Sequence, residues 1–322
     1  MPRPSNSINT RLISKVCTLY YHQSLNQQEI ADRLHLSRPK VSRLLTQGKE
    51  QGIIKITVNV PNNNYLETET LLEEKYKLKE VLITDIETPD DKSSIGIIKS
   101  QLGQSAANYL MRTVSEGDII GVTWGTTLHS MINSLQPKPV KNVHVIQTLG
   151  GVGPPEAKAH AMDISRSLSQ LLNSRLTLLP APGIVDSKES KKILLGDRQV
   201  NTALDLFSQI KIAYVGIGAV STNPVLGKDS YELSPALKKQ IHESDAVGDI
   251  GLNFFDIQGR PVDTKFRDLF IGMSLEEYKK VDTVVGIAGG YDKFEAIAGA
   301  LSGGYIDVLI TDQVTARKLA NS

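Results

Sequence analysis

In the first sixth of the chain, apolar residues recur with the period of an α-helix and predict two helices before a tight turn. Residues 10–23 form the first helix, with apolar positions at Leu12, Ile13, Val16, Cys17, Leu19 and Tyr20. Residues 26–34 form the second, in which Ile30, Ala31 and Leu34 face inward. Asn26 is a suitable N-cap, and Glu29 three residues later completes a capping-box pattern.

A third helix follows the turn at residues 35–37, and its polar side is basic. Ser37 caps this helix, Val41, Leu44 and Leu45 form its apolar seam, and Pro39 lies in the first turn, where a missing N–H costs little. Two short helices joined in this way, the second of them basic, are typical of a helix-turn-helix, whose second helix lies in the DNA major groove. The predicted DNA contacts are Ser37, Arg38, Lys40, Ser42 and Arg43. The alternative for each is an ordinary exposed residue.

The next two segments join this basic region to the rest of the chain. Residues 53–60 alternate in part and predict a strand, which would be the wing of a winged helix domain. Residues 65–78 predict a short acidic helix, which either connects two domains or pairs with a second subunit. These patterns divide the chain into a DNA-binding domain over 1–60, a linker with its helix over 61–79, and a C-terminal domain over 80–322.

From residue 80 onward, short apolar runs rich in β-branched residues alternate with helical stretches. Strands are predicted at residues 81–84, 119–122, 143–148, 176–179, 212–217, 283–288 and 308–311. Helices are predicted at residues 94–114, 126–135, 157–172, 190–209, 234–243, 274–280 and 293–302. Strands separated by helices favour an α/β fold with a parallel sheet that is covered on both faces.

Glycine-rich turns follow several of these strands, and ligands of open α/β sheets bind where the strands end. Gly125, Thr126 and Thr127 bring a tight turn, two hydroxyls and exposed N–H groups to a helix start, which suits an oxyanion or a phosphate. The alternative is a helix N-terminus without a ligand. Gly150 and Gly151 allow a ligand to approach the backbone closely after the next strand.

Two charged residues lie in later turns of the same kind. Lys293 begins a helix after a glycine pair, so its ammonium group can reach the strand ends and meet an anion; the alternative is a surface lysine. Because a cation at a helix N-terminus opposes the helix dipole, a bound anion explains Lys293 better. Asp249 either accepts hydrogen bonds from sugar hydroxyls or caps a turn, and the sequence leaves both interpretations open.

Charge separates the N-terminal segment from the rest of the chain. Residues 1–60 contain nine Lys or Arg and three Asp or Glu, and the remaining residues contain 27 and 32, although the whole chain has a net charge of +1. A basic segment suits contact with phosphodiesters, and the alternative is a solvated basic face. No apolar run approaches the ~20 residues of a membrane helix, and no signal-peptide pattern is present. We therefore expect a cytoplasmic location and no membrane contact.

Catalytic motifs are absent from the sequence. The single cysteine, Cys17, excludes an intrachain disulfide, and the six histidines lack the spacing of metal ligands. The Gly216-Ile217-Gly218 run lacks the third glycine of a dinucleotide-binding turn, and neither a nucleophile elbow nor a phosphate-binding P-loop occurs. We predict no catalytic residue, metal or cofactor.

The order of these motifs resembles the SorC family of sugar-binding bacterial transcriptional regulators, from about residue 11 to about residue 319. The N-terminal resemblance rests on residues 20–45, including Gln28-Glu29-Ile30-Ala31-Asp32-Arg33 and Lys40-Val41-Ser42-Arg43-Leu44-Leu45. The C-terminal resemblance rests on the turns at residues 125–127, 150–151, 216–218, 248–249 and 289–293, and on residues 303–307 and 311–312.

The resemblance implies a Rossmann-like effector domain similar to glucosamine-6-phosphate deaminase and ribose-5-phosphate isomerase, a homo-oligomer that is usually a tetramer, and operator DNA as partner. It implies that Gly125, Thr126, Thr127 and Lys293 hold the phosphate of a sugar, and that Gly150, Gly151 and Asp249 line the sugar site. Leu149 stands where some members carry Arg or Lys, which disfavours a bisphosphate or a Schiff base. A phosphorylated autoinducer-2-like effector stays possible in this family. The direction of the DNA response is open, and a sugar-phosphate isomerase or deaminase with an accessory DNA-binding domain is the alternative function.

Overall fold

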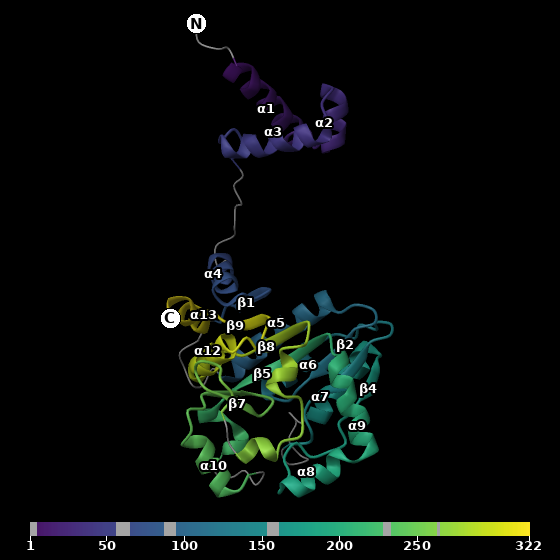
Figure 1. Ribbon diagram of the computed structural model, residues 1–322, viewed down its shortest axis with the longest axis vertical. Coiled ribbons are helices and arrows are strands. Elements are labelled where there is room, and N and C mark those ends of the chain that lie inside the picture. The colour runs from purple at the N-terminus through teal and green to yellow at the C-terminus, as the bar shows by residue number, and fades with distance from the viewer. Residues whose placement is uncertain (1–4, 56–64, 87–94, 153–160, 228–232, 263–264) are drawn as a thin grey trace. The chain divides into compact units, whose positions relative to one another are not determined.

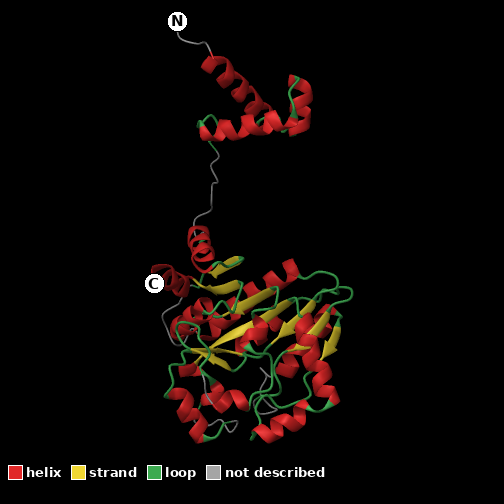
Figure 2. Cartoon of the chain, viewed as in Figure 1, coloured by secondary structure: helices red, strands yellow, loops and turns green. Residues whose placement is uncertain are grey.

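The computed structural model of the chain describes residues 5–55, 65–86, 95–152, 161–227, 233–262 and 265–322. The chain divides into two compact units, residues 1–62 and residues 63–322. The first unit consists of helices, and the second combines helices with a large sheet (Figure 2).

The first unit contains the three predicted helices, α1 (Ser5–Tyr21), α2 (Gln27–Leu34) and α3 (Arg38–Glu50) (Figure 1). Their apolar positions form one buried cluster, which consists of Ile13, Val16, Cys17, Leu19, Ile30, Ala31, Val41, Leu44 and Leu45. His35 ends α2 in the left-handed conformation with a φ of 53°, and this reverses the chain toward α3. The periodicity therefore identified both the helices and their buried faces.

The two predicted N-caps differ. Asn26 accepts hydrogen bonds from the N–H groups of Gln28 and Glu29, and the Glu29 carboxylate accepts the Asn26 N–H at 2.7 Å, so the capping box is confirmed. Ser37 occupies the N-cap position of α3, but its hydroxyl makes no capping bond, so that part of the prediction is wrong. Pro39 has no N–H to offer, and the Lys40 N–H bonds to the Ser37 carbonyl at 2.9 Å instead.

The predicted wing strand at residues 53–60 falls mostly outside the described residues. Its described part, residues 53–55, forms no strand. The predicted acidic helix is present as α4 (Leu66–Tyr76) in the second unit.

The second unit is built on a sheet whose principal strands are all parallel, and it contains every strand that the sequence predicts from residue 80 onward. These strands are β1 (Glu80–Thr84), β2 (Ile119–Val122), β3 (His144–Gln147), β4 (Arg175–Thr177), β5 (Ile212–Ala219), β8 (Thr283–Ile287) and β9 (Val308–Asp312). Their order across the sheet is β1-β9-β8-β5-β2-β3-β4. The carboxyl ends of all seven therefore lie along one edge, where ligands of such sheets bind.

Helices cover both faces of this sheet and create two buried clusters. One cluster joins α5 (Ile95–Thr113), α6 (Thr126–Ser134) and α7 (Ala161–Leu172) to residues such as Val122, Val145 and Val285 of the strands. The other joins α4, α9 (Arg198–Asp205), α12 (Phe294–Ser302) and α13 (Gln313–Asn321) to residues such as Val215 and Leu309. The predicted mixed α/β fold with a parallel sheet is confirmed.

Three features of the second unit were not predicted. The helix expected at residues 190–209 is broken into α8 (Lys188–Leu195), α9 and a short 3-10 turn, because the Asp197 carboxylate caps α9 through the N–H groups of Gln199 and Val200. The antiparallel hairpin of β6 (Gly248–Ile250) and β7 (Asn253–Phe255) has strands too short to show alternation. Helix α13 follows β9 directly, with Asp312 as its N-cap.

The hairpin extends the sheet beyond the carboxyl end of β5. Strand β6 pairs with β5 in antiparallel register, with Gly218 opposite Asp249. The hairpin, α10 (Pro235–His242) and neighbouring loops enclose a third apolar cluster that includes Leu149, Ile241, Leu252 and Phe254. A small subdomain is thus attached at the carboxyl edge of the main sheet.

Candidate functional site

Helix α3 presents a polar face that the first unit does not use for its own folding. The side chains of Arg38, Lys40, Ser42 and Arg43 are exposed, whereas Val41, Leu44 and Leu45 between them are buried. The side chains of Arg38, Lys40 and Arg43 form no ion pair and no hydrogen bond within the described part of the chain. Ser37 is also exposed, at the start of the same helix. The face therefore combines positive charge with unused hydrogen-bond donors.

In the second unit, the sheet reverses its winding direction between β2 and β5. From β2 the chain continues to β3 and β4 on one side, and from β5 it continues to β8 and β9 on the other. Loops that follow two adjacent strands diverge at such a point and leave room for a ligand. The predicted turns at residues 125–127, 150–151 and 289–293 follow β2, β3 and β8, which lie close together in the sheet on either side of β5. The predicted turns at residues 216–218 and 248–249 are wrong, because these residues lie within the paired strands β5 and β6.

The turn after β2 ends in a helix N-terminus whose donors are unused. Gly125 has a φ of 135°, a conformation that favours glycine, and α6 begins at Thr126 as predicted. The first bond within the helix runs from the His129 N–H to the Gly125 carbonyl at 2.9 Å. The N–H groups of residues 126–128 have no acceptor among the described residues, and a Cβ added to Gly125 would meet no atom within 4 Å. This open N-terminus suits an anion.

Trp124 connects this turn to the neighbouring strand β5. A Cβ built on Gly216 of β5 would lie 3.7 Å from the Trp124 carbonyl oxygen, which is an ordinary van der Waals distance between neighbouring segments. The Trp124 side chain is half-buried and packs against the third apolar cluster. Because it is the single tryptophan of the chain, Trp124 is a local fluorescent reporter for this part of the site.

Asp249 and Lys293 form the charged part of the site, next to the carboxyl end of β5. The Asp249 carboxylate is buried and accepts hydrogen bonds from the Asn223 side-chain amide at 2.8 Å and from the Leu252 N–H at 2.9 Å. The Lys293 ammonium donates to the Ile217 carbonyl at 2.9 Å. Lys293 therefore reaches the strand ends, as predicted, and is not an ordinary surface lysine. Asp249 caps a turn, which was one of its two predicted roles.

Burial dominates the electrostatics of these two groups. It raises the pKa of the Asp249 carboxyl group, although the Leu252 N–H, the charge of Lys293 and the Asn223 amide act in the opposite direction. Burial also lowers the pKa of Lys293, against the attraction of Asp249. Each charge is costly by itself and is partly compensated by the other. The site thus contains charged groups that an incoming anion and polar hydroxyls can satisfy further.

Asp312 fixes the turn that carries Lys293. Gly290 has a φ of 106°, which favours glycine, and its N–H donates to the Asp312 carboxylate at 2.7 Å. The same carboxylate caps α13 through the N–H groups of Val314 and Thr315. Sequence reasoning recorded Asp312 only as part of a resemblance and missed Asn223. An Asn-Pro turn signal at Asn223 and Pro224 is the sequence feature that points to the latter.

Gly150 and Gly151 are placed at the end of β3, but their backbone donors are occupied. The Gly150 N–H donates to the Ile271 carbonyl and the Gly151 N–H to the Ala181 carbonyl, at 3.1 and 2.9 Å. A Cβ on Gly150 would lie 2.6 Å from the Ala181 carbonyl oxygen, so close chain packing already requires glycine there. Contact between this pair and a sugar stays a prediction.

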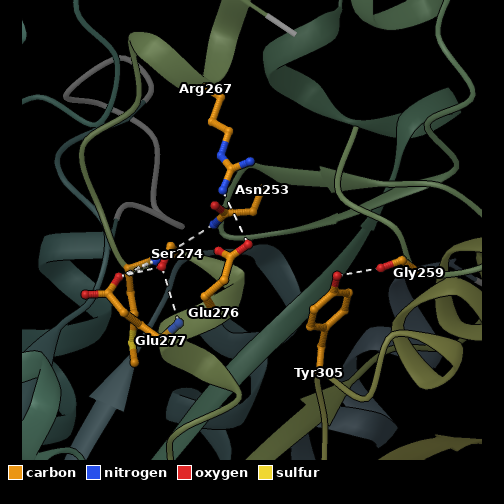
Figure 3. Close-up of polar contacts among 8 residues, drawn as sticks. Asn253, Gly259, Arg267, Ser274, Glu276, Glu277 and Tyr305 are labelled. Atoms are coloured by element: carbon orange, nitrogen blue, oxygen red, sulfur yellow. Dashed lines mark hydrogen bonds and ion pairs between the residues drawn. The ribbon is translucent and has the colours of Figure 1, made fainter. Parts of the chain in front are cut away.

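Polar contacts beyond the strand ends anchor the hairpin that carries Asp249 (Figure 3). The Asn253 amide donates to the Met273 and Ile250 carbonyls, each at 3.0 Å. Ser274 and Glu277 form a capping box for α11 (Leu275–Tyr278), and the Tyr305 hydroxyl donates to the Gly259 carbonyl. The bonds of Asn253 and Tyr305 join the subdomain to the segment before α11 and to the segment before β9.

Two negative observations apply to the described residues only. Among them, no cluster of His, Cys, Asp or Glu could hold a metal ion. No helix within the same ranges is long and apolar enough to cross a membrane.

The chain is similar to known sugar-binding domains and transcriptional regulators. The family model described as "Putative sugar-binding domain" matches residues 60–321, which makes the second unit a sugar-binding domain of this class. The chain is 35% identical over 314 residues to the deoxyribonucleoside regulator of Bacillus subtilis (strain 168), covering 97% of each protein. It is 32% identical over 316 residues to the transcriptional regulator LsrR of Escherichia coli O139:H28, covering 96% of this chain and 94% of that protein.

A solved structure of a named transcriptional regulator also matches this chain over nearly its whole length. The crystal structure of the full-length sorbitol operon regulator SorC from Klebsiella pneumoniae matches with a TM-score of 0.73 and 29% identity, covering 98% of this chain and 100% of that chain. The chain belongs to the SorC family of sugar-binding transcriptional regulators. The resemblance inferred from the sequence motifs is confirmed.

Proposed function

We propose that this chain regulates transcription of a carbohydrate operon and that a phosphorylated sugar controls its affinity for operator DNA. The observation that carries the proposal is a combination of two features in one chain. The basic face of α3 has no partner among the described residues, and the open α6 N-terminus and Lys293 both lie at the carboxyl ends of the neighbouring strands β2 and β5. The first feature suits a phosphodiester backbone, and the second suits a small phosphate ester.

The first unit acts in this proposal as a helix-turn-helix DNA-binding domain over residues 1–60, followed by a linker over 61–79. Helix α3 enters the major groove, and Ser37, Arg38, Lys40, Ser42 and Arg43 contact phosphates and base edges. Arginine is the residue best suited to guanine, because its guanidinium group bonds to O6 and N7 together. Support comes from the exposure of all five side chains and from the buried apolar seam behind them.

The effector domain over residues 80–322 binds the sugar phosphate at the winding reversal of its sheet. Gly125, Thr126, Thr127 and Lys293 hold the phosphate, and Gly150, Gly151 and Asp249 line the sugar site. The fold that we propose for this domain is Rossmann-like and similar to glucosamine-6-phosphate deaminase and ribose-5-phosphate isomerase. The chain works as a homo-oligomer, most simply a tetramer, in the cytoplasm.

The named relatives narrow the effectors to be tried. One is named a deoxyribonucleoside regulator and another a sorbitol operon regulator. We therefore select 2-deoxyribose 5-phosphate, ribose 5-phosphate, sorbitol 6-phosphate and a phosphorylated autoinducer-2 as the panel. Leu149 before the glycine pair argues against a bisphosphate, since it offers no second cation.

An isomerase or deaminase is the second candidate, favoured only by the buried carboxylate of Asp249. That chemistry needs a second acid or base as proton shuttle. The recorded partners of Asp249 are Asn223, Leu252 and Lys293, and none of these three is a histidine or a carboxylic acid. Incubation of the panel with the protein, followed for product formation, separates this candidate from a regulator.

The experiment that tests the proposal combines two readouts on the full chain. Trp124 fluorescence, titrated with each member of the panel, reports effector binding, since this tryptophan lies in the turn before α6. Gel-shift titration against a duplex that the wild-type chain selects from a random-sequence pool reports DNA binding. We expect saturable fluorescence changes for at least one sugar phosphate, which also shifts the DNA affinity. A chain that binds no duplex at low salt contradicts the proposal.

A further inference from the structure

Helix α13 is joined at its N-terminus to the turn that carries Lys293. One carboxylate oxygen of Asp312 accepts the N–H groups of Val314 and Thr315, each at 2.9 Å, and so caps α13. The other accepts the Gly290 N–H at 2.7 Å and the Thr315 hydroxyl at 2.7 Å. A single buried carboxylate therefore holds the turn and the helix together, and neither can shift without disturbing its bonds.

A second contact joins the same two elements on the surface. The Lys318 ammonium of α13 lies 4.9 Å from the ring centre of Tyr291, the residue that follows Gly290. Tyr291 is 68% exposed, so its ring has few other neighbours, and the cation–π contact with Lys318 is one of its main interactions. Between the two ends, Ala316 and Leu319 of α13 are fully buried in the core.

The far end of α13 is held by α4, which lies beside it (Figure 1). The Lys75 ammonium donates to the Leu319 carbonyl at 2.9 Å and to the Ser322 carbonyl at 3.1 Å. The Tyr76 hydroxyl also donates to the Leu319 carbonyl, at 3.4 Å. A cation at a helix C-terminus is favourable, because it satisfies free carbonyl groups and complements the helix dipole.

Helix α4 is attached to the rest of the second unit by a narrow apolar contact, at Leu72 and Tyr76, and by polar contacts. The Glu73 and Glu69 carboxylates accept the N–H groups of Val81 and Ile83 on the edge strand β1, both at 2.9 Å. Leu72 is the one residue of α4 that is fully buried, whereas Leu66 and Leu71 are 48% and 47% exposed. Because water can replace polar partners at small net cost, a helix attached in this way shifts more easily than one with a broad apolar face.

We propose that Asp312 is a positioning residue for the effector turn and that α13 transmits the state of that turn to α4. Along the chain, α4 is the first described helix after the basic helix α3, and residues 51–65 separate the two. A sugar phosphate held by Lys293 changes the position of Gly290, the Asp312 bonds carry the change into α13, and Lys75 and Tyr76 carry it to α4. This inference rests on the proposed function, because it concerns regulation of the same site.

The variant Asp312→Asn tests the first step. An asparagine side chain has one acceptor oxygen, so it either caps α13 or holds the Gly290 N–H, but not both. We expect the affinity for 2-deoxyribose 5-phosphate, or for the panel member with the largest fluorescence change, to fall by about tenfold. An unchanged affinity in the Trp124 titration overturns the positioning role.

The variant Lys75→Met tests the second step without touching the effector site. It keeps an unbranched side chain that is one atom shorter, and it removes the charge and the bonds to Leu319 and Ser322. The quantity to measure is the coupling ratio, the operator Kd with the sugar phosphate divided by the Kd without it, whose typical size is about 5- to 150-fold. We expect an unchanged effector affinity and a coupling ratio reduced to about twofold or less. Tyr76→Phe, which keeps the ring and removes two weaker bonds, to the Leu319 carbonyl and to the Ser322 hydroxyl, should reduce the ratio by a smaller factor.

Lys280→Met is the matched control, because Lys280 is exposed and makes no recorded side-chain contact among the described residues. The relay is overturned when Lys75→Met and Tyr76→Phe both respond like wild type, or when Lys280→Met loses coupling equally. If Lys75→Met fails to fold, Tyr76→Phe decides the question. A wild-type chain whose DNA affinity ignores every panel member refutes the proposed function itself, and the relay falls with it. A responsive wild type with unaffected variants refutes only the relay.

Discussion

Positive charge serves opposite purposes in the two units. On α3, Arg38, Lys40 and Arg43 lie on the surface without a described protein partner, while an apolar cluster behind them holds the helices together. In the second unit, Lys293 lies among protein groups, donates to the Ile217 carbonyl and is attracted by the charge of the buried Asp249. Among the described residues, the cations on α3 make no contact that the fold requires, whereas Lys293 takes part in the packing of the second unit. Function and stability should therefore separate in one unit and stay coupled in the other.

Exposure to water decides how much each charge contributes to the free energy of folding. Exposed charges interact through water and salt, so each contributes little to folding and acts mostly on an approaching polyanion. A buried charge has lost its hydration and depends on its partners, so removing one partner leaves the other uncompensated. The following changes test that contrast, beginning with the largest expected effect.

Asp249→Ala should give the largest effect and should act on stability. The change leaves the Lys293 ammonium without its opposite charge, and leaves the Leu252 N–H and the Asn223 amide without their acceptor. Leaving these buried donors without their acceptor costs about 1–3 kcal/mol, and the loss of the nearby opposite charge adds to this cost. Chemical denaturation, followed by circular dichroism, should show a midpoint well below that of wild type.

The matched comparison is Asp249→Ala in a Lys293→Met background, where no uncompensated cation remains. Most of the loss should be recovered if the charge is its source. Equal destabilisation in both backgrounds would show that the hydrogen bonds to Asn223 and Leu252 carry the cost instead. Wild-type stability of the single variant would remove the contrast between the two units.

Arg43→Ala should act on DNA affinity alone. A good contact between arginine and guanine contributes about 1–3 kcal/mol, or roughly 5- to 150-fold in the operator Kd. Because the side chain is exposed and makes no recorded contact with a described residue, the free energy of unfolding should change by less than about 0.5 kcal/mol. Gel-shift titration and chemical denaturation of one preparation measure both quantities.

Arg198→Ala removes the same charge from an exposed position of α9 and serves as the control for net charge. It should leave the operator Kd unchanged at constant salt. If Arg43→Ala and Arg198→Ala weaken binding alike, the effect is one of total charge, and Arg43 is not at the interface.

The response to pH should separate effector affinity from stability. Burial lowers the pKa of Lys293 below the ordinary lysine value of 10.5, while Asp249 and Asp292 oppose this shift and Lys99 adds to it. Above the lowered pKa the cation is lost, so sugar-phosphate affinity should fall, by up to about tenfold per pH unit. Stability should change in the opposite direction, because between the two pKa values the unfolded chain binds more protons than the folded chain.

Trp124 titrations and denaturation curves at a series of alkaline pH values measure these two trends. Lys293→Met should abolish both. A parallel fall of affinity and stability in the wild-type chain would indicate general alkaline unfolding. Asp249 contributes in a lower pH range: its raised pKa means that its contribution to stability is lost as pH rises through the folded value.

The sequence predicted the scaffold well, because burial imposes strong periodicity. All three helices of the first unit and all seven parallel strands of the second were found, since each needs several apolar residues on a fixed face. The hairpin of β6 and β7 was missed because three residues per strand show no period. The predicted helix at 190–209 was too long, because Asp197 caps a new helix, α9, and so separates it from α8.

The candidate site was predicted in part for a related reason. Glycine turns and the charges of Asp249 and Lys293 could be seen in the sequence, because residue type alone suggests their chemistry. The partners that give those charges their surroundings, such as Asn223 and Asp312, come from distant segments, and one sequence contains no record of such contacts. The contrast between surface and buried cations could therefore be recognised only from the structure.

The smallest expected effects compare two helix caps within the first unit. Asn26 accepts two backbone N–H groups, and Asn26→Ala should destabilise the chain by about 1 kcal/mol. Ser37 makes no capping bond, so Ser37→Ala should change the free energy of unfolding by less than about 0.5 kcal/mol and should act only on the operator Kd. Denaturation curves of both variants, each with a gel-shift titration, test this difference. A Ser37 variant that loses stability to the same extent as the Asn26 variant would show that the hydroxyl belongs to the fold, and would remove Ser37 from the set of residues that are free to meet DNA.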